Sequence, residues 1–231
     1  MPAAGSGSRM GSRRPKQYLH LLGKPILQHT LERLCLSRIA GIVVCLAEED
    51  IYWESLTLPK PVIRVSGGAE RCHSVLNGLQ VLRQRAQPDD WVLVHDAARP
   101  CVRQADIEKL MTQLALHPVG GLLAVPVRDT MKRAALSTSN SHQEKIEIEI
   151  VETINREGLW HALTPQMFRL ETLYNALQSV LSSGELVTDD AQAIERLGLR
   201  PVLIEGHADN IKVTHPQDLN LAELYLRQLE L

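Results

Sequence analysis

The stretch WVLVHDAARP, residues 91–100, is the best starting point for predicting the fold. Its first five residues form a short, mostly apolar run that is typical of a strand buried on both faces. Asp96 follows this run directly, and in an open α/β sheet the carboxyl ends of the strands form the edge where ligands bind. The stretch therefore predicts a buried strand that carries an acidic side chain into a binding site.

Similar runs and helical segments surround this strand. Further β-branched or apolar runs cover residues 39–46, 62–65 and 122–127. Apolar residues at helical spacing predict helices near residues 25–34, 70–85, 104–116, 168–182, 189–197 and 216–229. We expect Thr188, followed by Asp189 and Asp190, to cap one of these helices. The alternation predicts βαβ units with right-handed crossovers, and so an α/β fold with a mostly parallel, Rossmann-like sheet.

Composition limits the classes of protein that the chain could belong to. Its 231 residues suit a single domain over residues 1–231, and 44% hydrophobic residues allow a sizeable core. A net charge of −2 gives no sign of a nucleic-acid partner or a membrane surface, and no apolar run approaches a membrane span. We expect no signal peptide. Four widely spaced cysteines without a CxxC pair suggest thiols in a reducing cytoplasm.

The pattern changes over residues 132–157. A polar loop at 137–141 is followed by KIEIEIVETI, residues 145–154, in which apolar and acidic residues alternate. Strict alternation predicts a half-buried strand, but nothing in the expected main sheet requires it. We expect a projecting β arm that packs on a second subunit. An edge strand with a charged outer face is the alternative.

The segment PAAGSGSRMGSRRPKQ, residues 2–17, suggests a phosphate site. Small residues at 3–8 let the backbone approach a ligand, and successive N–H groups there can surround an anion. Arg9 and Lys16 place cations beside this loop. The segment matches neither the dinucleotide-binding GxGxxG pattern nor the P-loop pattern, which disfavours both classes. A flexible tail with incidental basic residues remains the alternative.

Acidic residues suggest a metal site. Asp96 is a natural Mg²⁺ ligand beside phosphates, because Mg²⁺ prefers one or two carboxylates together with phosphate oxygens and water. A structural role for Asp96, as a helix cap, is the other interpretation. Within GHADNIKVT, residues 206–214, Asp209 offers a second carboxylate and Lys212 a cation. We expect Arg99 to contact a phosphate or hydroxyl group, and His95 to pack at the strand end rather than act as a base.

These segments together resemble a known family. The patterns PAAGxGxRM and PKQ, then VHDAARP and DNIKVT, are similar in order and content to the 2-C-methyl-D-erythritol 4-phosphate cytidylyltransferases. SGGAERCHSV (66–75), PVRDTMKR (126–133) and LWHALTPQ (159–166) extend the match from Pro2 to about residue 226. The resemblance implies a nucleotidyltransferase domain whose β arm clasps a second subunit in a homodimer.

The resemblance also implies a reaction. The enzyme would transfer CMP from CTP to 2-C-methyl-D-erythritol 4-phosphate, with Mg²⁺ or another divalent cation. The products would be pyrophosphate and 4-diphosphocytidyl-2-C-methyl-D-erythritol, an intermediate of non-mevalonate isoprenoid synthesis. The phosphate monoester is already an anion at neutral pH and needs no general base. Cations that stabilise charge on the non-bridging oxygens would then be the main catalytic device.

The resemblance assigns roles to individual positions. The positions that match the CTP loop are Ala3, Ala4, Gly5 and Gly7. Those that match the cytosine and ribose contacts are Gly68, Ala69 and Ser74. Asp96 and Asp209 match acidic positions near Mg²⁺, and Arg9 and Lys16 match catalytic cations. The positions that handle the methylerythritol phosphate are Thr130, Arg156, Thr188 and Lys212. Arg156 and Lys212 also count as catalytic, and Thr130 and Arg156 would reach the site across the dimer.

One departure from the family concerns the first strand. The family has an apolar strand directly before the PAAG loop, whereas here Met1 is followed at once by Pro2. On this basis the family's first strand is missing, which should leave a gap or let the neighbouring strands close up. Two other functions stay open. The chain could act on another polyol phosphate, such as ribitol 5-phosphate, or be an inactive truncated homologue that binds nucleotide or partners.

Overall fold

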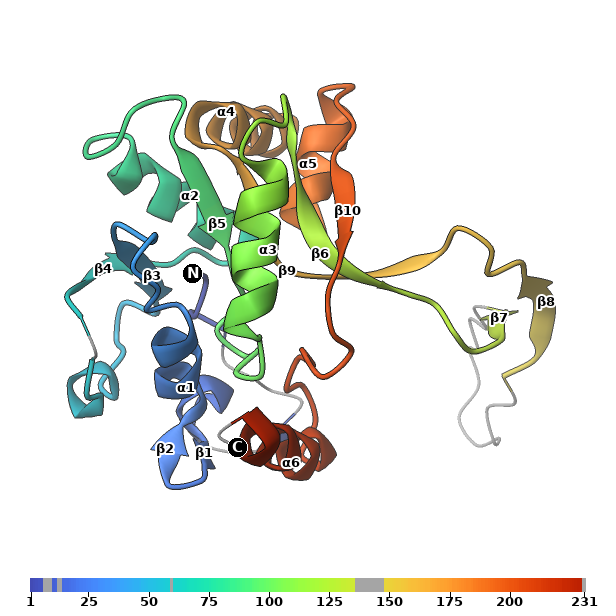
Figure 1. Cartoon of the computed structure of the whole chain (residues 1–231), viewed down its shortest axis with the longest axis horizontal. Coiled ribbons are helices and arrows are strands. Elements are labelled where there is room, and N and C mark those ends of the chain that lie inside the picture. Colours follow the sequence, from blue (N-terminus) through green and yellow to red (C-terminus); the bar gives the residue numbers. More distant parts are fainter. Residues whose placement is uncertain (6–9, 12–13, 59, 136–147, 230–231) are drawn as a thin grey trace.

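The computed structural model describes residues 1–5, 10–11, 14–58, 60–135 and 148–229 (Figure 1). Its largest sheet has the strand order β10-β6-β9-β5, formed by Val202–Glu205, Gly120–Pro126, Trp160–Arg169 and Trp91–Val94. β10 is parallel to β6, whereas β9 runs antiparallel to both of its neighbours. The expected α/β class is confirmed, but the sequence pattern did not predict β9 as a strand.

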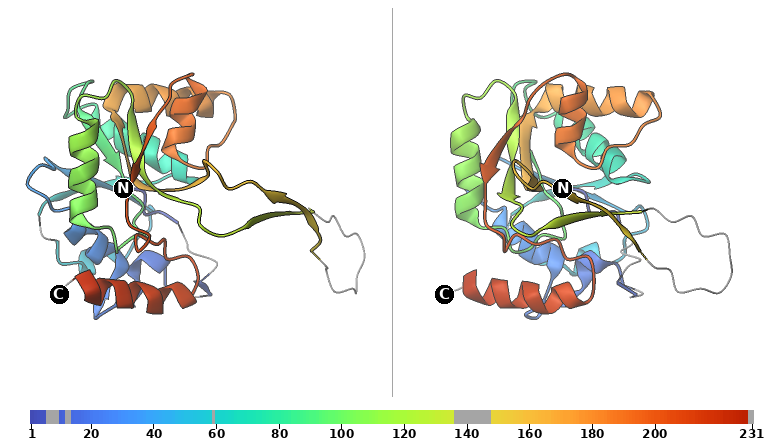
Figure 2. Two further views of the ribbon diagram at one scale, coloured as in Figure 1. Left: turned by 45° about the vertical axis from the view of Figure 1, so that its right-hand side comes forward. Right: turned by 90° about the vertical axis from the view of Figure 1, so that its right-hand side faces the viewer.

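Helices cover both faces of this sheet (Figure 2). α3 (Gln104–Leu114) packs on one face, and α2 (Arg71–Leu82), α4 (Leu170–Ser182) and α5 (Asp190–Arg196) pack on the other. Consecutive strand residues alternate between the two cores: Leu123 and Met167 join the α3 side, whereas Leu122 and Phe168 join the opposite side. Strands buried on both faces explain the continuous apolar runs in the sequence.

The cap of α5 differs by one residue from the sequence-based expectation. Asp189, rather than Thr188, is the N-cap, and its side chain accepts a hydrogen bond from the Gln192 amide at 2.9 Å. The Gln192 side chain in turn accepts from the Thr188 amide at 2.8 Å. An aspartate is as good a cap as a threonine, so spacing alone could not decide between the two residues.

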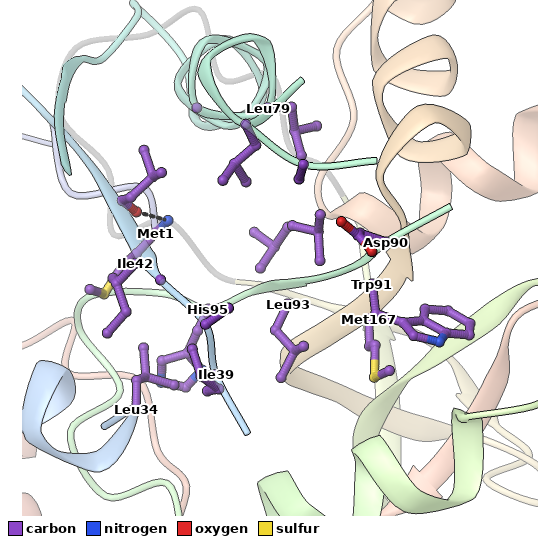
Figure 3. A pocket seen from close by; sticks show the side chains of 18 of the residues that line it. Met1, Leu34, Ile39, Ile42, Leu79, Asp90, Trp91, Leu93, His95 and Met167 are labelled. Carbon is purple, nitrogen blue, oxygen red and sulfur yellow. Dashed lines mark hydrogen bonds between the residues drawn. The ribbon is translucent and has the colours of Figure 1, made fainter. Parts of the chain in front are cut away.

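A smaller parallel pair, β3 (Ile42–Leu46) and β4 (Val62–Ser66), stands apart from the main sheet. The first residues of the chain run alongside β3, where Pro2 forms a parallel bridge with Cys45. The short 3-10 helix η3 (Trp53–Ser55) lies in the connection between β3 and β4. β3 and β5 are not paired, and a cavity lies between them (Figure 3). The two strands have therefore not closed up on each other.

A third group of elements lies below the main sheet in Figure 1. It combines η2 (Lys16–Tyr18), the short hairpin β1 (His20–Leu21) and β2 (Lys24–Pro25), α1 (Ile26–Arg33), and the C-terminal helix α6 (Gln217–Leu229). Its core joins Leu21 and Ile26 to Val213, Ala222 and Leu226. This packing connects the start of the chain to the segment that follows β10. No helix among the described residues is long and apolar enough to cross a membrane.

A two-stranded hairpin extends away from the rest of the chain (Figures 1 and 2). β7 (Met131–Ala134) pairs antiparallel with β8 (Ile150–Ile154). The polar loop at 137–141 and the first residues of the alternating stretch, 145–147, lie outside the described residues. Ile150 and Val151 are adjacent in sequence, yet they are 65% and 61% exposed. Because adjacent strand residues point to opposite faces, both faces of the hairpin are uncovered within one chain.

Candidate active site

Asp96 lies at the carboxyl end of β5, as the sequence predicts, and is surrounded by cations. Its Oδ1 accepts from Arg71 Nε at 2.9 Å, and its Oδ2 lies 2.8 Å from Lys212 Nζ. Arg99 Nε is 3.8 Å from the same Oδ2. The backbone amide of Asp96 donates to Thr164 Oγ1 at 3.1 Å, which fixes the residue against β9. The structure thus joins two predicted site residues, Asp96 and Lys212, that are far apart in sequence.

The charge of Asp96 depends on these neighbours. Burial disfavours the carboxylate, but Arg71 and Lys212 outweigh burial and hold the pKa of Asp96 well below its usual range. The group is therefore ionised at neutral pH. An ionised carboxylate that is only 6% exposed remains stable here because its two oxygens are paired with cations.

Arg71 is a site residue that sequence reasoning missed. It begins α2, and its Nη2 donates to Asp190 Oδ2 at 2.7 Å while its Nε holds Asp96. Asp190 is fully buried at the first turn of α5. Burial raises the pKa of Asp190, against the opposing effect of Arg71. One guanidinium thus connects β5, α2 and α5 at the edge where Asp96 lies.

Two loops of small residues meet near the carboxyl end of β3. A Cβ atom added to Gly67 would lie 2.4 Å from the Ala4 side chain and 3.2 Å from the Leu46 carbonyl oxygen, so only glycine allows this approach. The Gly68 amide donates to Ser74 Oγ at 3.0 Å, which ties the second loop to α2. The predicted nucleotide positions Ala3–Gly5 and 68–74 are thus adjacent. Gly7 and Arg9 lie outside the described residues.

Lys16 joins this group through the segment after β10. Its Nζ donates to the Val213 carbonyl at 3.1 Å, and the Val213 amide donates to the Ala98 carbonyl at 2.8 Å. Lys212 precedes Val213 and contacts Asp96. Lys16, Lys212 and Asp96 therefore come from three segments that touch one another. Arg71, Arg99 and Lys212 surround Asp96, and this excess of cations suits an anionic ligand.

Asp209 is placed differently from Asp96. Its Oδ2 accepts from Arg103 Nε at 2.8 Å and Nη2 at 2.5 Å, whereas its Oδ1 is buried without a hydrogen-bond partner. Among the described residues, no group of three or more His, Cys, Asp or Glu side chains could hold a metal ion. Asp96 and Asp209 thus do not form a preformed metal-binding site together. Mg²⁺ commonly uses one or two protein carboxylates together with phosphate oxygens and water.

His95 and Arg99 support the loop between β5 and α3. His95 is 1% exposed, its Nδ1 lies 2.9 Å from Thr164 Oγ1, and its Nε2 lies 3.1 Å from the Arg99 carbonyl. Burial lowers the pKa of His95 to about 4, so the ring is neutral at pH 7. Arg99 Nη1 donates to the Asn210 carbonyl at 2.6 Å. The guanidinium of Arg99, predicted to meet substrate, thus also fastens the 206–214 segment.

The remaining predicted substrate residues lie apart from this group. Thr130 precedes β7 and Arg156 follows β8, so both are at the base of the hairpin, and both are exposed. Arg156 Nη1 donates to the Arg128 carbonyl, which joins the two legs of the hairpin. Thr188 lies before α5 and bonds Gln192. No contact between these three residues and Asp96 is found within the described part of one chain.

Comparisons with known proteins agree with this arrangement. The family model of 2-C-methyl-D-erythritol 4-phosphate cytidylyltransferase matches residues 1–228. The enzyme of that name from Aliivibrio fischeri strain MJ11 is 50% identical over 100% of this chain and 93% of its own length. The one from Vibrio vulnificus strain YJ016 is 51% identical over 98% of this chain and 92% of its own length.

Solved structures show the same likeness. The crystal structure of the Francisella tularensis 2-C-methyl-D-erythritol 4-phosphate cytidylyltransferase superposes with a TM-score of 0.80 at 36% identity, covering 97% of this chain and 96% of that one. The enzyme of that name from Thermus thermophilus gives 0.74 at 29% identity, covering 97% and 96%. The family model matches residues 1–228, and relatives are about 50% identical over nearly the whole chain. The chain therefore belongs to the 2-C-methyl-D-erythritol 4-phosphate cytidylyltransferase family.

Proposed function

We propose that this protein transfers CMP from CTP to 2-C-methyl-D-erythritol 4-phosphate and releases pyrophosphate. One observation carries the proposal: Asp96 and Lys212 form a 2.8 Å ion pair at the sheet edge, next to segments that bring Lys16 and the small-residue loops together. A site of this kind can place a triphosphate and a phosphate monoester side by side. Family membership supplies the identity of the two substrates.

The chemistry needs cations more than it needs a base. The attacking phosphate monoester carries a charge of about −1.5 to −2 at neutral pH and requires no deprotonation. The neutral, buried His95 ring is engaged on both nitrogens, so it is not a base in this scheme. In this proposal Lys16 and Lys212 stabilise charge on the non-bridging oxygens of the α-phosphate, where it accumulates in the transition state. We also assign Arg9 to this role.

A divalent cation completes the proposed site. Asp96 would hold it together with nucleotide phosphates, and the bound ion would neutralise charge on those phosphates. Arg71 and Lys212 keep Asp96 ionised and fix its orientation before the nucleotide arrives. Asp209 stays a candidate ligand through its unpartnered Oδ1, although Arg103 holds its other oxygen.

A homodimer would complete the acceptor site. The β7–β8 hairpin exposes Ile150 and Val151, and such apolar side chains are expected to be covered by a partner. Thr130 and Arg156 lie at the hairpin base, where a second copy could bring them to the methylerythritol phosphate. We place the enzyme in the cytoplasm, because four cysteines that form no disulfide suit a reducing compartment.

Pyrophosphate release from CTP, Mg²⁺ and methylerythritol phosphate tests the proposal. Release should require both substrates, and Lys212→Ala should lower kcat/KM by about 100-fold or more, in the range for loss of one charge-stabilising group. Lys24→Ala, which removes a half-exposed lysine paired with Glu32, is the matched control and should be unaffected. Equal loss in both variants would contradict the assigned role.

The same assay separates the competing functions. Faster release with ribitol 5-phosphate would identify a different acceptor, and the absence of release with any acceptor would identify a binding protein. Light scattering on the same sample gives the subunit count, and a monomer at micromolar concentration would refute the dimer.

A further inference from the structure

One side of α3 contacts the segment that leads from β10 towards Asp96. Three polar residues, at the N-cap and in the first turns of α3, are spaced three apart, so they form a row along the helix. The contacts join Lys109 to the Glu205 carbonyl, Asp106 to His207 and Arg103 to Asp209. The row and the segment run in opposite directions, and α3 therefore holds the segment at three successive points.

Asp106 makes the strongest of these three contacts. Its Oδ2 accepts from the His207 backbone amide at 3.0 Å, and its Oδ1 lies 2.8 Å from His207 Nδ1. Asp106 is only 2% exposed, whereas Arg103 is half-exposed and Lys109 is exposed. Water competes for exposed contacts, which therefore contribute little, while a buried carboxylate keeps its hydrogen bonds. One carboxylate thus fixes both the backbone and the ring of His207.

The helix that carries Asp106 is itself firmly attached to the sheet. Ile107, Leu110 and Leu114 of α3 are completely buried. They belong to the same core as Leu123 of β6 and Met167 of β9. Because tightly packed apolar side chains resist displacement, the Asp106 carboxylate has a fixed place relative to the main sheet.

The contacted segment continues through residues 207–212, which form neither helix nor strand. Backbone hydrogen bonds of Gly206 to β6 and of Val213 to the loop after β5 fasten its two ends. Between these ends, the Asn210 amide donates to the His207 carbonyl at 3.2 Å and closes a turn. The position of His207 therefore determines where Asn210 and the residues after it lie.

We propose that Asp106 is a positioning residue for the reaction, which holds Lys212 against Asp96 by fixing His207. Lys212 Nζ lies 2.8 Å from Asp96 Oδ2, and its side chain is partly exposed on a flexible stem, so its place depends on the backbone that carries it. A shift of about 1 Å at a catalytic group can cost about 100-fold in rate. The inference rests on the proposed function, in which Lys212 stabilises the transition state.

A purely structural role for Asp106 predicts a different result. An acidic residue in the first turn of a helix also stabilises that helix through its dipole. Among the described residues, however, the hydrogen bonds to the Asp106 carboxylate all come from His207. Loss of a helix-stabilising charge would change the stability of the fold, whereas loss of a positioning contact would change the rate of the reaction through Lys212.

The first test is the kinetics of pyrophosphate release. Asp106→Ala removes both hydrogen bonds to His207 and should lower kcat by about 10- to 100-fold, with the KM for CTP changed by less than about threefold. Asp106→Asn keeps an oxygen for the His207 amide and should recover kcat to within about fivefold of the unaltered protein. Glu108→Ala removes an exposed carboxylate from the same helix and is the matched control, with unchanged kcat. A normal kcat in Asp106→Ala would overturn the proposal.

A double-variant cycle shows whether the effect passes through Lys212. If Asp106 acts by positioning Lys212, adding Asp106→Ala to Lys212→Ala should lower kcat by less than about twofold more. The same 10- to 100-fold loss in both backgrounds would overturn the proposal, because Asp106 would then act independently of Lys212.

Hydrogen exchange tests the positioning without relying on activity. Asp106→Ala should speed exchange at the Asn210 and Val213 amides by about tenfold and leave the β6 amides unchanged. Unaltered exchange at Asn210 and Val213 would overturn the proposal, and so would equal acceleration throughout β6, which indicates a general loss of stability. If the unaltered protein releases no pyrophosphate but exchange changes as expected, the proposed function fails while the positioning of the segment by Asp106 stands.

Discussion

Removing the guanidinium of Arg71 should destabilise the fold through a residue far from it in sequence. Arg71→Met keeps much of the side-chain volume but leaves Asp190, which is fully buried, without the cation that pairs with it. Asp190 Oδ1 already lacks a hydrogen-bond partner, and Oδ2 accepts from Arg71. In Arg71→Met neither oxygen of the Asp190 carboxyl group would therefore keep a partner. Asp96 is affected less, because Lys212 still holds its Oδ2.

The expected cost follows from breaking a buried ion pair on one side. Such changes cost about 3–5 kcal/mol, because the charge that remains is neither solvated nor paired. For a domain of this size about 1 kcal/mol corresponds to about 2–4 °C, so the melting temperature should fall by about 6–20 °C. Urea unfolding followed by circular dichroism measures the free energy directly.

The double variant Arg71→Met/Asp190→Asn is the decisive control. It removes the unpaired charge of Asp190 and should recover a large part of the lost free energy of unfolding. The coupling energy between the two substitutions should exceed about 1 kcal/mol. Arg83→Met is a matched surface variant, since Arg83 pairs with Glu171 in a half-exposed bridge, and it should cost far less than Arg71→Met. If Arg71→Met is as mild as Arg83→Met, or if Asp190→Asn gives no recovery, the reasoning about the buried network is wrong.

Two further predictions concern pH and the nucleotide loops. The pKa of His95 is about 4 when folded and about 6.5 when unfolded, so its contribution to stability is complete above pH 6.5 and is lost as pH falls towards 4. The loss should reach about 3 kcal/mol, and His95→Gln should flatten this pH dependence while His20→Gln, at an exposed position, should not. Gly67→Ala should raise the KM for CTP by about tenfold, because the new methyl group meets Ala4. Gly41→Ala, with no atom within 4 Å, is its control, and equal KM values would contradict the close packing of the two loops.

Some parts of the site follow from local sequence. The run at 91–95 predicted β5 and the position of Asp96, because hydrophobic periodicity and strand ends depend only on nearby residues. The helices were predicted to within a few residues for the same reason. β9 was missed because its first three residues are exposed and the following six are buried, several of them polar, so WHALTPQMFR shows neither alternation nor a continuous apolar run.

The sequence by itself determined the fold class and the acidic strand end, because both depend on residues that are close along the chain. Only the tertiary structure decided which charges meet. Arg71 and Asp190 are 119 positions apart, and Asp209 pairs with Arg103 rather than joining Asp96. It also decided that the space between β3 and β5 stays open. Ion pairs and cavities depend on how distant segments pack, and no local pattern encodes that geometry.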